Sequence, residues 1–398
     1  MPLRIAIDVR HIRDYGIGSY IRNLIAALDR RTDEHTYVLA GRRQDLHELP
    51  ALSPRFTRAE FPRSDSGMAN QATFPWFLRR FRPDISHIPL NSVALLLQKP
   101  YVVTVHDMSS LLFPQDRASR VGAIRHRYRL FRFRRGLLRA DRIIAVSQAT
   151  QRDLESLLSI PPDRIRQIYG AVDTRYLEAF VPADARAAGP HAAEFHRRRL
   201  QERYQIHHPY LLYAGTIRPQ KNIPKLIEAF AVLRAELAGH PTLCELRLLV
   251  IGDAISKYPD VRRAVVNARL ENYVRFFGFV SADALRAFYE GAQAFVFPSL
   301  YEGFGLPPLE AMAVGTPVVA SNLSSLPEAV GDAAEPVNPE NLFDIVRGIR
   351  EVLLNTSHRE RLIQRGYAQV RRFHWDRTAA EVMAVYEEVG QKRRQSSH

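Results

Sequence analysis

Residues 294–321 read AFVFPSLYEGFGLPPLEAMAVGTPVVAS, and this segment decides the fold of the second half of the chain. The apolar run AFVFP predicts a strand, LPPLEAMAV predicts a helix with proline at its first positions, and Gly315 stops that helix before the strand PVVAS. A strand, a helix and a second strand in this order are typical of a parallel sheet covered by helices. Glu302 therefore falls on the strand-to-helix loop, and Glu310 falls in the first turns of the helix.

The two acids in this segment point to a ligand. In open parallel sheets, ligands bind outside the carboxyl ends of the strands, and the N-terminus of a helix attracts phosphate through its N–H groups. Gly303 and Gly305 let the backbone approach such a ligand without a Cβ in the way. A carboxylate beside a phosphate is best used to accept hydrogen bonds from sugar hydroxyls. We therefore expect Glu302 and Glu310 to hold two hydroxylated groups that flank a diphosphate.

Cations that would balance the diphosphate occur in YAGTIRPQKNIPKLIEAF, residues 213–230. A predicted strand ends at Gly215, the next loop carries Arg218 and Lys221, and a helix follows. Arginine presents a planar fork to phosphate oxygens, and lysine presents a compact point charge. Because this loop also follows the carboxyl end of a strand, we expect it to face the same crevice as Glu302.

The first half of the chain offers weaker signals. In DVRHIRDYGIGSYIRNL, residues 8–24, the pair Gly16 and Gly18 precedes a helix that we expect to begin at Ser19, which would make an anion site. The third glycine of a dinucleotide fingerprint is missing, which weighs against a nicotinamide dehydrogenase. His106 ends the predicted strand YVVTVH, where its ring suits either a hydroxyl contact or a structural hydrogen bond.

Strand and helix patterns alternate along the chain, which predicts an α/β protein with two doubly wound domains in tandem. We place an N-terminal Rossmann-like domain at 1–173, a linker at 174–208 and a second Rossmann-like domain at 209–375. A helix at 376–390 is expected to pack back on the first domain. Ser147 would cap a helix directly after the strand RIIAVS. The predicted strands are 5–9, 36–40, 85–88, 101–106, 142–147, 166–170, 210–215, 246–252, 274–280, 294–298 and 317–321.

Composition limits the compartment. The 398 residues carry a net charge of +14 and one cysteine, Cys244, which excludes an intramolecular disulfide framework. Residues 1–170 hold 28 Lys and Arg against 16 Asp and Glu, so a surplus of 28 − 16 = +12 lies in this half. No apolar run approaches the length of about 20 residues that crosses a bilayer, and the N-terminus lacks the apolar stretch of a secretory signal. We expect a cytoplasmic protein, soluble or peripheral on the inner face of the membrane.

Taken together, these residues resemble a known family, the retaining family 4 glycosyltransferases of GT-B fold, in which two Rossmann-like domains face an interdomain cleft. The pair of glutamates eight positions apart, Glu302 and Glu310, is its most specific mark. GTIRPQKN, VIGDA, FFGFV, ADRIIAVS and IYGAVD occur in the order of the family, and the resemblance covers residues 3–385. The sequence around Arg218 and Glu302 is similar to that of mannosyltransferases that use GDP-mannose. Glucosyl and N-acetylglucosaminyl transferases are nearly as similar in these segments.

The resemblance implies a role for each matched residue. Arg218 and Lys221 would bind the donor diphosphate and stabilise charge as it leaves. Glu302 would grip the transferred sugar, Glu310 would accept hydrogen bonds from the ribose, and His106 would lie near the transferred sugar. The further donor-binding positions that the resemblance implies are Gly16, Gly18, Gly215, Gly252, Phe279, Gly303, Phe304, Gly305 and Leu306.

The implied reaction moves a sugar, with retention, from a nucleotide sugar to an acceptor hydroxyl. The resemblance implies no bound metal and no cofactor, because cationic side chains and a helix terminus would take the place of Mg²⁺. One departure from the family stands at Tyr15, where many relatives have glycine, and it leaves the role of Gly16 less secure.

The acceptor should be recognised by the basic first domain. RHRYRLFRFRRGLLRADR, residues 125–142, interleaves eight arginines with aromatic and aliphatic residues. Two interpretations stay open: a helix that rests on an anionic bilayer, and a core-packed helix whose other face is solvated arginine. We expect a lipid-linked or lipopolysaccharide-type glycan and no nucleic acid, because no aromatic stacking platform accompanies the charge. The alternatives are a transferase that uses UDP-glucose or UDP-N-acetylglucosamine on a soluble sugar, and a non-catalytic nucleotide-sugar-binding subunit.

Overall fold

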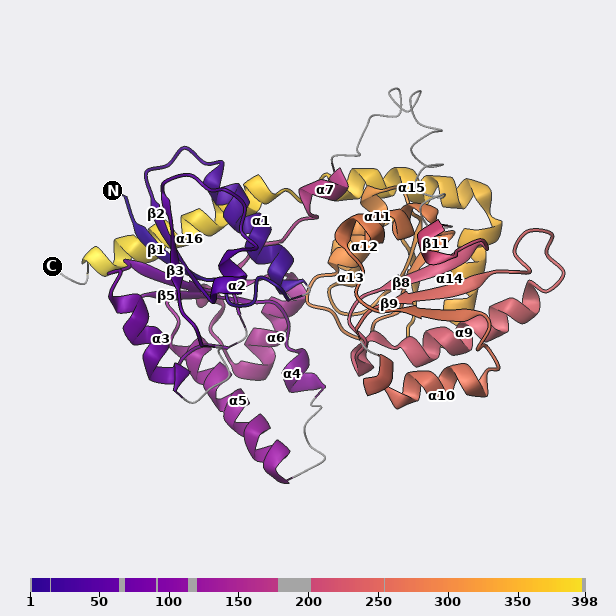
Figure 1. The fold of residues 1–398 in the computed structure, drawn as a ribbon, viewed down its shortest axis with the longest axis horizontal. Coiled ribbons are helices and arrows are strands. Elements are labelled where there is room, and N and C mark those ends of the chain that lie inside the picture. Colours follow the sequence, from indigo (N-terminus) through magenta and orange to yellow (C-terminus); the bar gives the residue numbers. More distant parts are fainter. Residues whose placement is uncertain are drawn as a thin grey trace. The chain divides into compact units, whose positions relative to one another are not determined.

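The computed structural model describes residues 2–14, 16–63, 69–90, 92–113, 120–177, 202–253 and 255–395. They divide into two compact units, one formed by Met1–Ala171 with Phe373–His398 and the other by Val172–Arg372 (Figure 1). Tyr15 and most of the expected linker lie outside the described residues. In the described part of the chain, none of the helices is long and apolar enough to span a membrane.

The first unit is built on a parallel sheet. Its described strands number seven, in the order β3-β2-β1-β4-β5-β6-β7. The strand order reverses between β1 and β4, and in open α/β sheets this switch point is where ligands bind. The strands are β1 (Arg4–Asp8), β2 (Thr36–Gly41), β3 (Phe56–Glu60), β4 (Ile85–Ile88), β5 (Tyr101–Val105), β6 (Arg142–Ala145) and β7 (Ile165–Gln167).

Helices cover both faces of this sheet. Figure 1 shows α1 and α16 on one side and α3, α5 and α6 on the other, and α1 packs against α16. Ser147 caps α6 as the sequence predicts, since its Oγ accepts a hydrogen bond from the Thr150 N–H at 2.9 Å. The helices are α1 (Ile17–Asp29), α2 (Arg43–Leu46), α3 (Asn70–Arg79), α4 (Ser109–Leu112), α5 (Arg120–Arg139), α6 (Gln148–Leu158), α16 (Trp375–Gln395) and the 3-10 turn η1 (Pro162–Arg164).

The second unit repeats this architecture. Its described strands form a six-stranded parallel sheet in the order β10-β9-β8-β11-β12-β13, with the switch point between β8 and β11. Its central strands are buried along their whole length, which is why they read as continuous apolar runs in the sequence. The strands are β8 (Tyr210–Ala214), β9 (Arg247–Ile251), β10 (Val274–Phe277), β11 (Ala294–Phe297), β12 (Val318–Ser321) and β13 (Glu335–Val337).

The helices of the second unit pack in two layers. α9 contacts both α10 and α14, whereas α12 contacts α11, α13 and α15. The α-helices are α7 (Thr174–Leu177), α9 (Ile223–Glu236), α10 (Pro259–Asn267), α11 (Ala282–Gly291), α12 (Leu306–Ala313), α13 (Leu326–Val330), α14 (Leu342–Leu354) and α15 (Thr356–Val370). The 3-10 turns are η3 (Pro219–Lys221) and η4 (Ile255–Lys257).

The structure corrects one helix boundary of functional interest. We expected Ser19 to begin the first helix, but α1 begins at Ile17 and its N-cap position is Gly16. Gly16 has φ +66°, a backbone conformation that glycine adopts without strain. Ser19 lies inside the helix, where its carbonyl accepts a hydrogen bond from Asn23 Nδ2 at 2.9 Å.

Candidate active site

The cationic loop of the second unit follows β8 at the switch point. Ile217 anchors it, because its N–H donates to Asp253 Oδ1 at 2.7 Å. Asn222, in the left-handed conformation with φ +59°, ends η3 and begins α9. Its side-chain Nδ2 donates to the carbonyls of Pro298 and Pro339 at 3.2 and 2.7 Å, which ties the loop to two other strand ends.

Two glycines let the neighbouring loops approach this one. Gly215 has φ +155°, and a Cβ on Gly252 would lie 2.5 Å from the carbonyl oxygen of Gly215. A side chain at position 252 would therefore collide with backbone that cannot swing away. The structure accounts for Gly252 by chain packing, and the donor role that we expected for it stays a prediction.

The acidic loop follows β11, the strand beside β8. It is fixed to the cationic loop by a backbone hydrogen bond from the Leu300 N–H to the Gln220 carbonyl at 2.8 Å. Ser324 and Ser325 donate to the carbonyl of Glu302 at 2.8 and 3.0 Å. Gly305 has φ +105° at the N-cap of α12, so only glycine is unstrained there.

Lys221 and Glu302 meet across the switch point. Lys221 Nζ lies 2.6 Å from both Oε atoms of Glu302. Both side chains are nearly buried, and the ammonium group lies 5.8 Å from the centre of the Phe297 ring. We expected these two residues to contact different parts of a ligand, and here they neutralise each other.

Two buried polar atoms lie beside this ion pair in the sequence. Ser299 Oγ and Gln220 Oε1 have no hydrogen-bond partner among the described residues, although both side chains are buried. An unsatisfied buried polar atom costs about 1–3 kcal/mol. We did not predict either residue from the sequence, and a polar residue directly after a strand is the signal that marks Ser299.

Arg218 differs from Lys221 in its surroundings. Its side chain is exposed and, among the described residues, forms no hydrogen bond or ion pair. It lies near enough to Tyr258 for its charge to lower the pKa of that phenol, which burial and Asp253 raise. The site thus combines one paired cation and one that is available to a ligand.

Glu310 lies on α12 among groups that we did not predict. Tyr289, on α11, donates its hydroxyl to Glu310 Oε2 at 3.0 Å. Burial raises the pKa of Glu310 to about 7; the Tyr289 hydrogen bond and Arg175 oppose that rise, and Asp173 adds to it. Asp173 and Arg175 form an ion pair at 2.9 Å at the start of the second unit. The carboxyl of Glu310 is therefore readily protonated near neutral pH.

The remaining expected donor-binding residues of the second unit lie at the same sheet edge. Phe279 follows β10 and its side chain is exposed, whereas Phe304 is buried in the loop after β11. Leu306 is the first residue of α12, and Gly303 precedes it in the same loop. The structure brings these residues to the carboxyl ends of parallel strands, where a phosphate ligand is expected.

In the first unit, the two glycines of the first loop differ. A Cβ on Gly18 would lie 2.2 Å from the Ile12 carbonyl oxygen, so contact with its own chain requires glycine there. A Cβ on Gly16 would meet nothing within 4 Å. Open space beside a helix N-cap keeps Gly16 as the candidate for contact with a ligand.

His106 follows β5 and is held in two ways. Its Nε2 donates to the Pro89 carbonyl at 3.1 Å, and its ring meets the Tyr20 ring edge-to-face at 4.9 Å. Burial lowers the pKa of His106 to about 4, so the imidazole is neutral at pH 7. The structural hydrogen bond that we considered is present, and a contact with substrate stays a prediction.

A buried polar chain runs behind His106. His87 Nδ1 is hydrogen-bonded to the Tyr386 hydroxyl at 2.5 Å, and its Nε2 is hydrogen-bonded to Thr104 Oγ1 at 2.8 Å. Thr104 in turn lies 3.4 Å from the Tyr20 hydroxyl. Burial and the nearby His106 lower the pKa of His87 to about 3. Helix α16 is thus linked through three side chains to the residue that holds His106.

Among the described residues, no group of three or more His, Cys, Asp or Glu side chains is arranged to hold a metal ion. The charged side chains that we predicted for the site in the second unit are Arg218, Lys221, Glu302 and Glu310, and the structure adds Asp173 and Arg175 beside Glu310.

Two Rossmann-like units, the second with a cationic and an acidic loop at its switch point, define a GT-B glycosyltransferase. The family described as Glycosyltransferase Family 4 matches residues 15–176, and Glycosyl transferases group 1 matches residues 197–369. O-antigen chain mannosyltransferase B of Escherichia coli is 32% identical over 312 residues, which cover 78% of this chain and 76% of that protein. The chain therefore belongs to the glycosyltransferases whose two domains these models describe.

Two further comparisons bear on the chain. The serotype-specific mannosyltransferase WbdA of Escherichia coli is 34% identical over 241 residues, which cover 61% of this chain and 28% of WbdA. This chain therefore matches little more than a quarter of WbdA. The structure of Anabaena HepE in complex with UDP-glucose superposes with a TM-score of 0.71 at 17% identity, covering 96% of this chain and all of the other, which shows the common fold.

Proposed function

We propose that the chain is a retaining hexosyltransferase that moves mannose from GDP-mannose to a hydroxyl of a lipid-linked or polysaccharide glycan. The observation that carries this proposal is the arrangement at the switch point of the second unit. There Arg218 is exposed and forms no ion pair with a described residue, and Lys221 is paired with Glu302. Cations and an acid at one strand-end edge suit a ligand that has both phosphate and hydroxyl groups.

Donor binding would rearrange the ion pair. A diphosphate brings negative charge to Arg218 and Lys221, so Lys221 can exchange Glu302 for phosphate oxygens. Glu302 is then left to accept hydrogen bonds from the hydroxyls of the transferred sugar. Ser299 Oγ and Gln220 Oε1 are buried and have no hydrogen-bond partner in the part of the chain that the structure describes, and they would bond to further groups of the nucleotide sugar. Glu310 would accept the ribose hydroxyls once it is ionised.

The chemistry needs charge stabilisation more than proton transfer by a side chain. The bond between the sugar C1 and the donor phosphate breaks, and a bond from the acceptor oxygen to C1 forms on the same face. The acceptor proton passes to a phosphate oxygen of the leaving diphosphate. Arg218 and Lys221 would stabilise the charge that develops on that group, and such electrostatic contacts are usually the largest contribution to catalysis. In this proposal the reaction uses no bound metal.

The mannosyl donor and the glycan acceptor are inferred from relatives. O-antigen chain mannosyltransferase B is a mannosyltransferase by name and shares 32% of its residues with this chain over the matched length. The donor-side loop and the two glutamates lie within the matched group 1 segment, residues 197–369. A glycan that is built on a lipid would bring the acceptor to a membrane surface, so the enzyme would work there as a peripheral protein.

The proposal is tested with the purified protein and a panel of nucleotide sugars, without an acceptor. Slow release of GDP from GDP-mannose, with little release from UDP-glucose or UDP-N-acetylglucosamine, is expected. Arg218→Ala should slow this hydrolysis about 10²–10³-fold. The matched control Arg262→Ala, at an exposed arginine on α10, should leave it unchanged.

Three outcomes would contradict parts of this proposal. Equal hydrolysis of all donors would remove the choice of GDP-mannose. Release of nucleotide that is unchanged in Arg218→Ala would place the reaction elsewhere. Loss of hydrolysis in EDTA that added Mg²⁺ restores would show that a metal takes part. The anomeric configuration of the transferred sugar, read by NMR on a glycan product, decides between retention and inversion.

A further inference from the structure

Helix α5 exposes an apolar stripe on the face opposite its buried one. Ile124 and Phe131 are seven residues apart, and their side chains are 68% and 56% exposed. Leu138, seven residues further along, is also exposed. Seven residues make almost two helical turns, so the three side chains form one line along the helix. On the other face Phe133 and Leu137 are buried, so α5 already packs on the core without using the side chains of the stripe.

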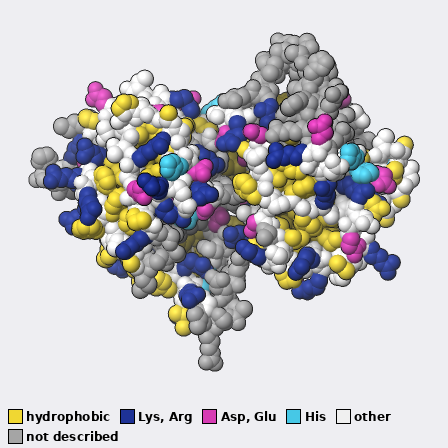
Figure 2. Space-filling model, viewed as in Figure 1, with side chains coloured by type: hydrophobic (Ala, Val, Ile, Leu, Met, Phe, Trp, Pro, Cys, Tyr) yellow, Lys and Arg dark blue, Asp and Glu magenta, His cyan; other side chains and the backbone are white. Residues whose placement is uncertain are grey.

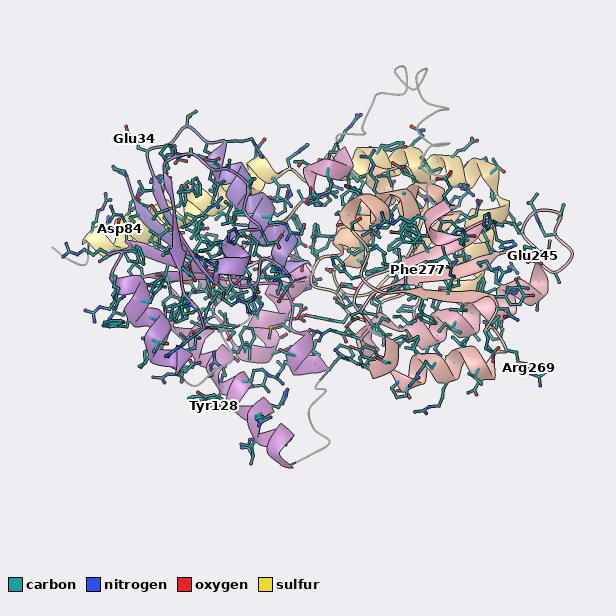
Figure 3. The ribbon with its side chains drawn as sticks, in the orientation of Figure 1. Glu34, Asp84, Tyr128, Glu245, Arg269 and Phe277 are labelled. Carbon is teal, nitrogen blue, oxygen red and sulfur yellow. The ribbon has the colours of Figure 1, made fainter. Side chains whose placement is uncertain are left out.

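Arginines flank this stripe without acidic partners. Arg127 and Arg134 follow Ile124 and Phe131 by three residues, so each lies beside one apolar side chain on the helix surface. Both are exposed, and neither forms a hydrogen bond or ion pair with a described residue. The sequence from 120 to 139 holds no Asp or Glu. The helix therefore presents apolar groups and uncompensated positive charge on one face. Tyr128, on the same helix, is labelled in Figure 3.

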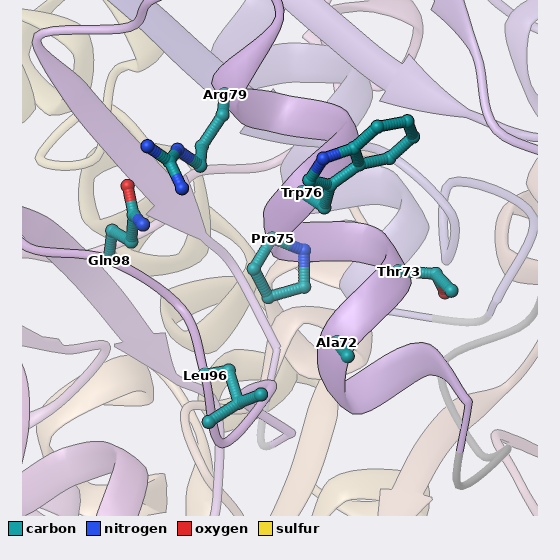
Figure 4. Close-up of a pocket in the computed structure, with 7 residues that line it drawn as sticks. All are labelled: Ala72, Thr73, Pro75, Trp76, Arg79, Leu96 and Gln98. Atoms are coloured by element: carbon teal, nitrogen blue, oxygen red, sulfur yellow. The ribbon is translucent and has the colours of Figure 1, made fainter.

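A second exposed apolar site lies between α3 and the loop that follows β4. Figure 4 shows this groove, of about 390 Å³, with Trp76 and Leu96 on its two sides. The Trp76 side chain is 59% exposed, and the Arg80 guanidinium lies 3.9 Å from the centre of its ring. Arg79 also lines the groove. An exposed indole beside arginines is the composition found where proteins meet the polar region of a bilayer.

The groove and the stripe are carried by neighbouring elements of the first unit. Leu95, next to Leu96, donates its N–H to Gln71 Oε1 of α3 at 3.0 Å. From the other side, Arg132 of α5 donates to Ser92 Oγ at 3.0 Å. The loop at 92–98 is therefore held between the two helices. Figure 1 shows α3 and α5 on the same side of the sheet, and Figure 2 shows hydrophobic and basic side chains interspersed over the first unit.

We propose that this surface, formed by Trp76, Leu96, Ile124, Phe131 and Leu138 with the arginines around them, docks on an anionic lipid bilayer. The apolar groups enter the boundary between headgroups and acyl chains, and the arginines meet lipid phosphates. Each basic residue near such a surface contributes about 1 kcal/mol, so three to five of them suffice for reversible binding. This inference deepens the proposed function, because it rests on an acceptor carried by lipid, and it names the partner of the first unit.

The test measures binding of the full chain to vesicles without donor or acceptor. Flotation with vesicles of phosphatidylcholine and phosphatidylglycerol at 3:1 should carry the protein upward, whereas vesicles of phosphatidylcholine alone should not. The double variant Ile124→Ser/Phe131→Ser should bind about tenfold or more weakly. The matched control Val266→Ser/Phe343→Ser changes two equally exposed apolar side chains of the second unit and should bind as the wild type does.

Tryptophan fluorescence adds a reading at one position. The chain has two tryptophans, and Trp375 is buried whereas Trp76 is exposed. Binding to anionic vesicles should shift the emission to shorter wavelength. Trp76→Phe should remove the shift while the protein still floats with the vesicles.

The outcomes separate this inference from the proposed function. Equal binding to neutral and anionic vesicles, or wild-type binding by Ile124→Ser/Phe131→Ser, would overturn it. Binding only to an acidic protein, with no flotation, would also overturn it and would identify another class of partner. Donor hydrolysis in vesicle-free buffer should be the same in Ile124→Ser/Phe131→Ser and in the wild type. Failure of the transferase proposal would therefore appear in the hydrolysis assay and not in flotation.

Discussion

Lys221 Nζ lies 2.6 Å from both carboxylate oxygens of Glu302, although the two residues are 81 positions apart in the sequence. Both side chains are nearly buried, and the loops that carry them follow the neighbouring strands β8 and β11. A buried ion pair contributes little net stability, because desolvation of both charges offsets their attraction. Its presence at a switch point is therefore better explained by what it does with a ligand than by what it adds to the fold.

Removal of either partner should cost both activity and stability. Lys221→Met leaves the Glu302 carboxylate nearly buried without its cation, which should lower the free energy of unfolding by about 3–5 kcal/mol. Glu302→Leu should lower the free energy of unfolding by a similar amount, because it leaves the Lys221 ammonium group nearly buried without its carboxylate. The double variant should regain most of the stability, because the two apolar side chains pack where the charges were. Donor hydrolysis should stay undetectable in all three variants.

Urea unfolding and donor hydrolysis, measured on the same preparations, separate the two effects. A double variant that regains stability without activity supports a ligand-binding role for the pair. Wild-type rates of hydrolysis in either single variant would remove both residues from the proposed mechanism.

Ser299 should matter to the donor and not to the free protein. Its hydroxyl is buried without a partner among the described residues, so Ser299→Ala should leave the free energy of unfolding unchanged or raise it slightly. Loss of one hydrogen bond to the donor should weaken donor binding about tenfold. The contrasting variant is Ser321→Ala, because Ser321 Oγ already accepts from the Leu323 N–H at 3.1 Å and its removal should destabilise the protein. Calorimetry and urea unfolding measure the two quantities, and a donor affinity unchanged in Ser299→Ala would leave its orphaned hydroxyl unexplained.

Much of the fold could be predicted from the sequence, because buried parallel strands appear as apolar runs. β8, β11 and β12 are buried along their whole length and lie where the sequence placed them. The edge strands β3 and β13 were not predicted. β3 reads FTRAE, with buried and exposed positions mixed, and β13 has only three residues, so neither has an apolar run to detect. Their pairing with β2 and β12 depends on the rest of the sheet.

The site was predictable in its loops but not in its contacts. Glycine, proline and strand ends located Arg218, Lys221 and Glu302 on two loops of one edge, because turn chemistry is local. The ion pair between Lys221 and Glu302 depends on which strands are neighbours, which sequence spacing does not reveal. The surroundings of Glu310 likewise come from Tyr289 and from Asp173, residues distant in sequence. The roles that we assigned to these residues toward a donor stay predictions.

Donor binding should depend on the ionisation of Glu310. Burial raises the pKa of this carboxyl to about 7, so at pH 6 most of it is protonated and can accept fewer hydrogen bonds. Donor affinity should therefore rise as the pH increases through 7 and level off near pH 8. In Glu310→Gln the affinity should be lower and independent of pH over this range. Calorimetric titration of GDP-mannose from pH 6 to 8 measures this, and an inflection near pH 7 that persists in Glu310→Gln would assign it to another group.

Stability should fall in mild acid because two histidines are buried in neutral form. Burial lowers the pKa of His87 to about 3 and of His106 to about 4, whereas the unfolded chain titrates at the ordinary value. Below pH about 6.5 the unfolded state therefore binds more protons than the folded state. The stability that the two neutral histidines contribute is complete above that pH and is lost as the pH falls toward 4. One pH unit below 6.5, each histidine should cost about 1.4 kcal/mol, or about 3 kcal/mol for the two. Protonation of Glu310, whose pKa burial raises to about 7, offsets part of this loss over the same pH range. Urea unfolding at pH 7.5 and 5.5 measures the net change, and in His106→Gln the free energy of unfolding should fall by about 1.4 kcal/mol less than in the wild type. A loss of the same size in wild type and His106→Gln would show that His106 is not neutral in the folded protein.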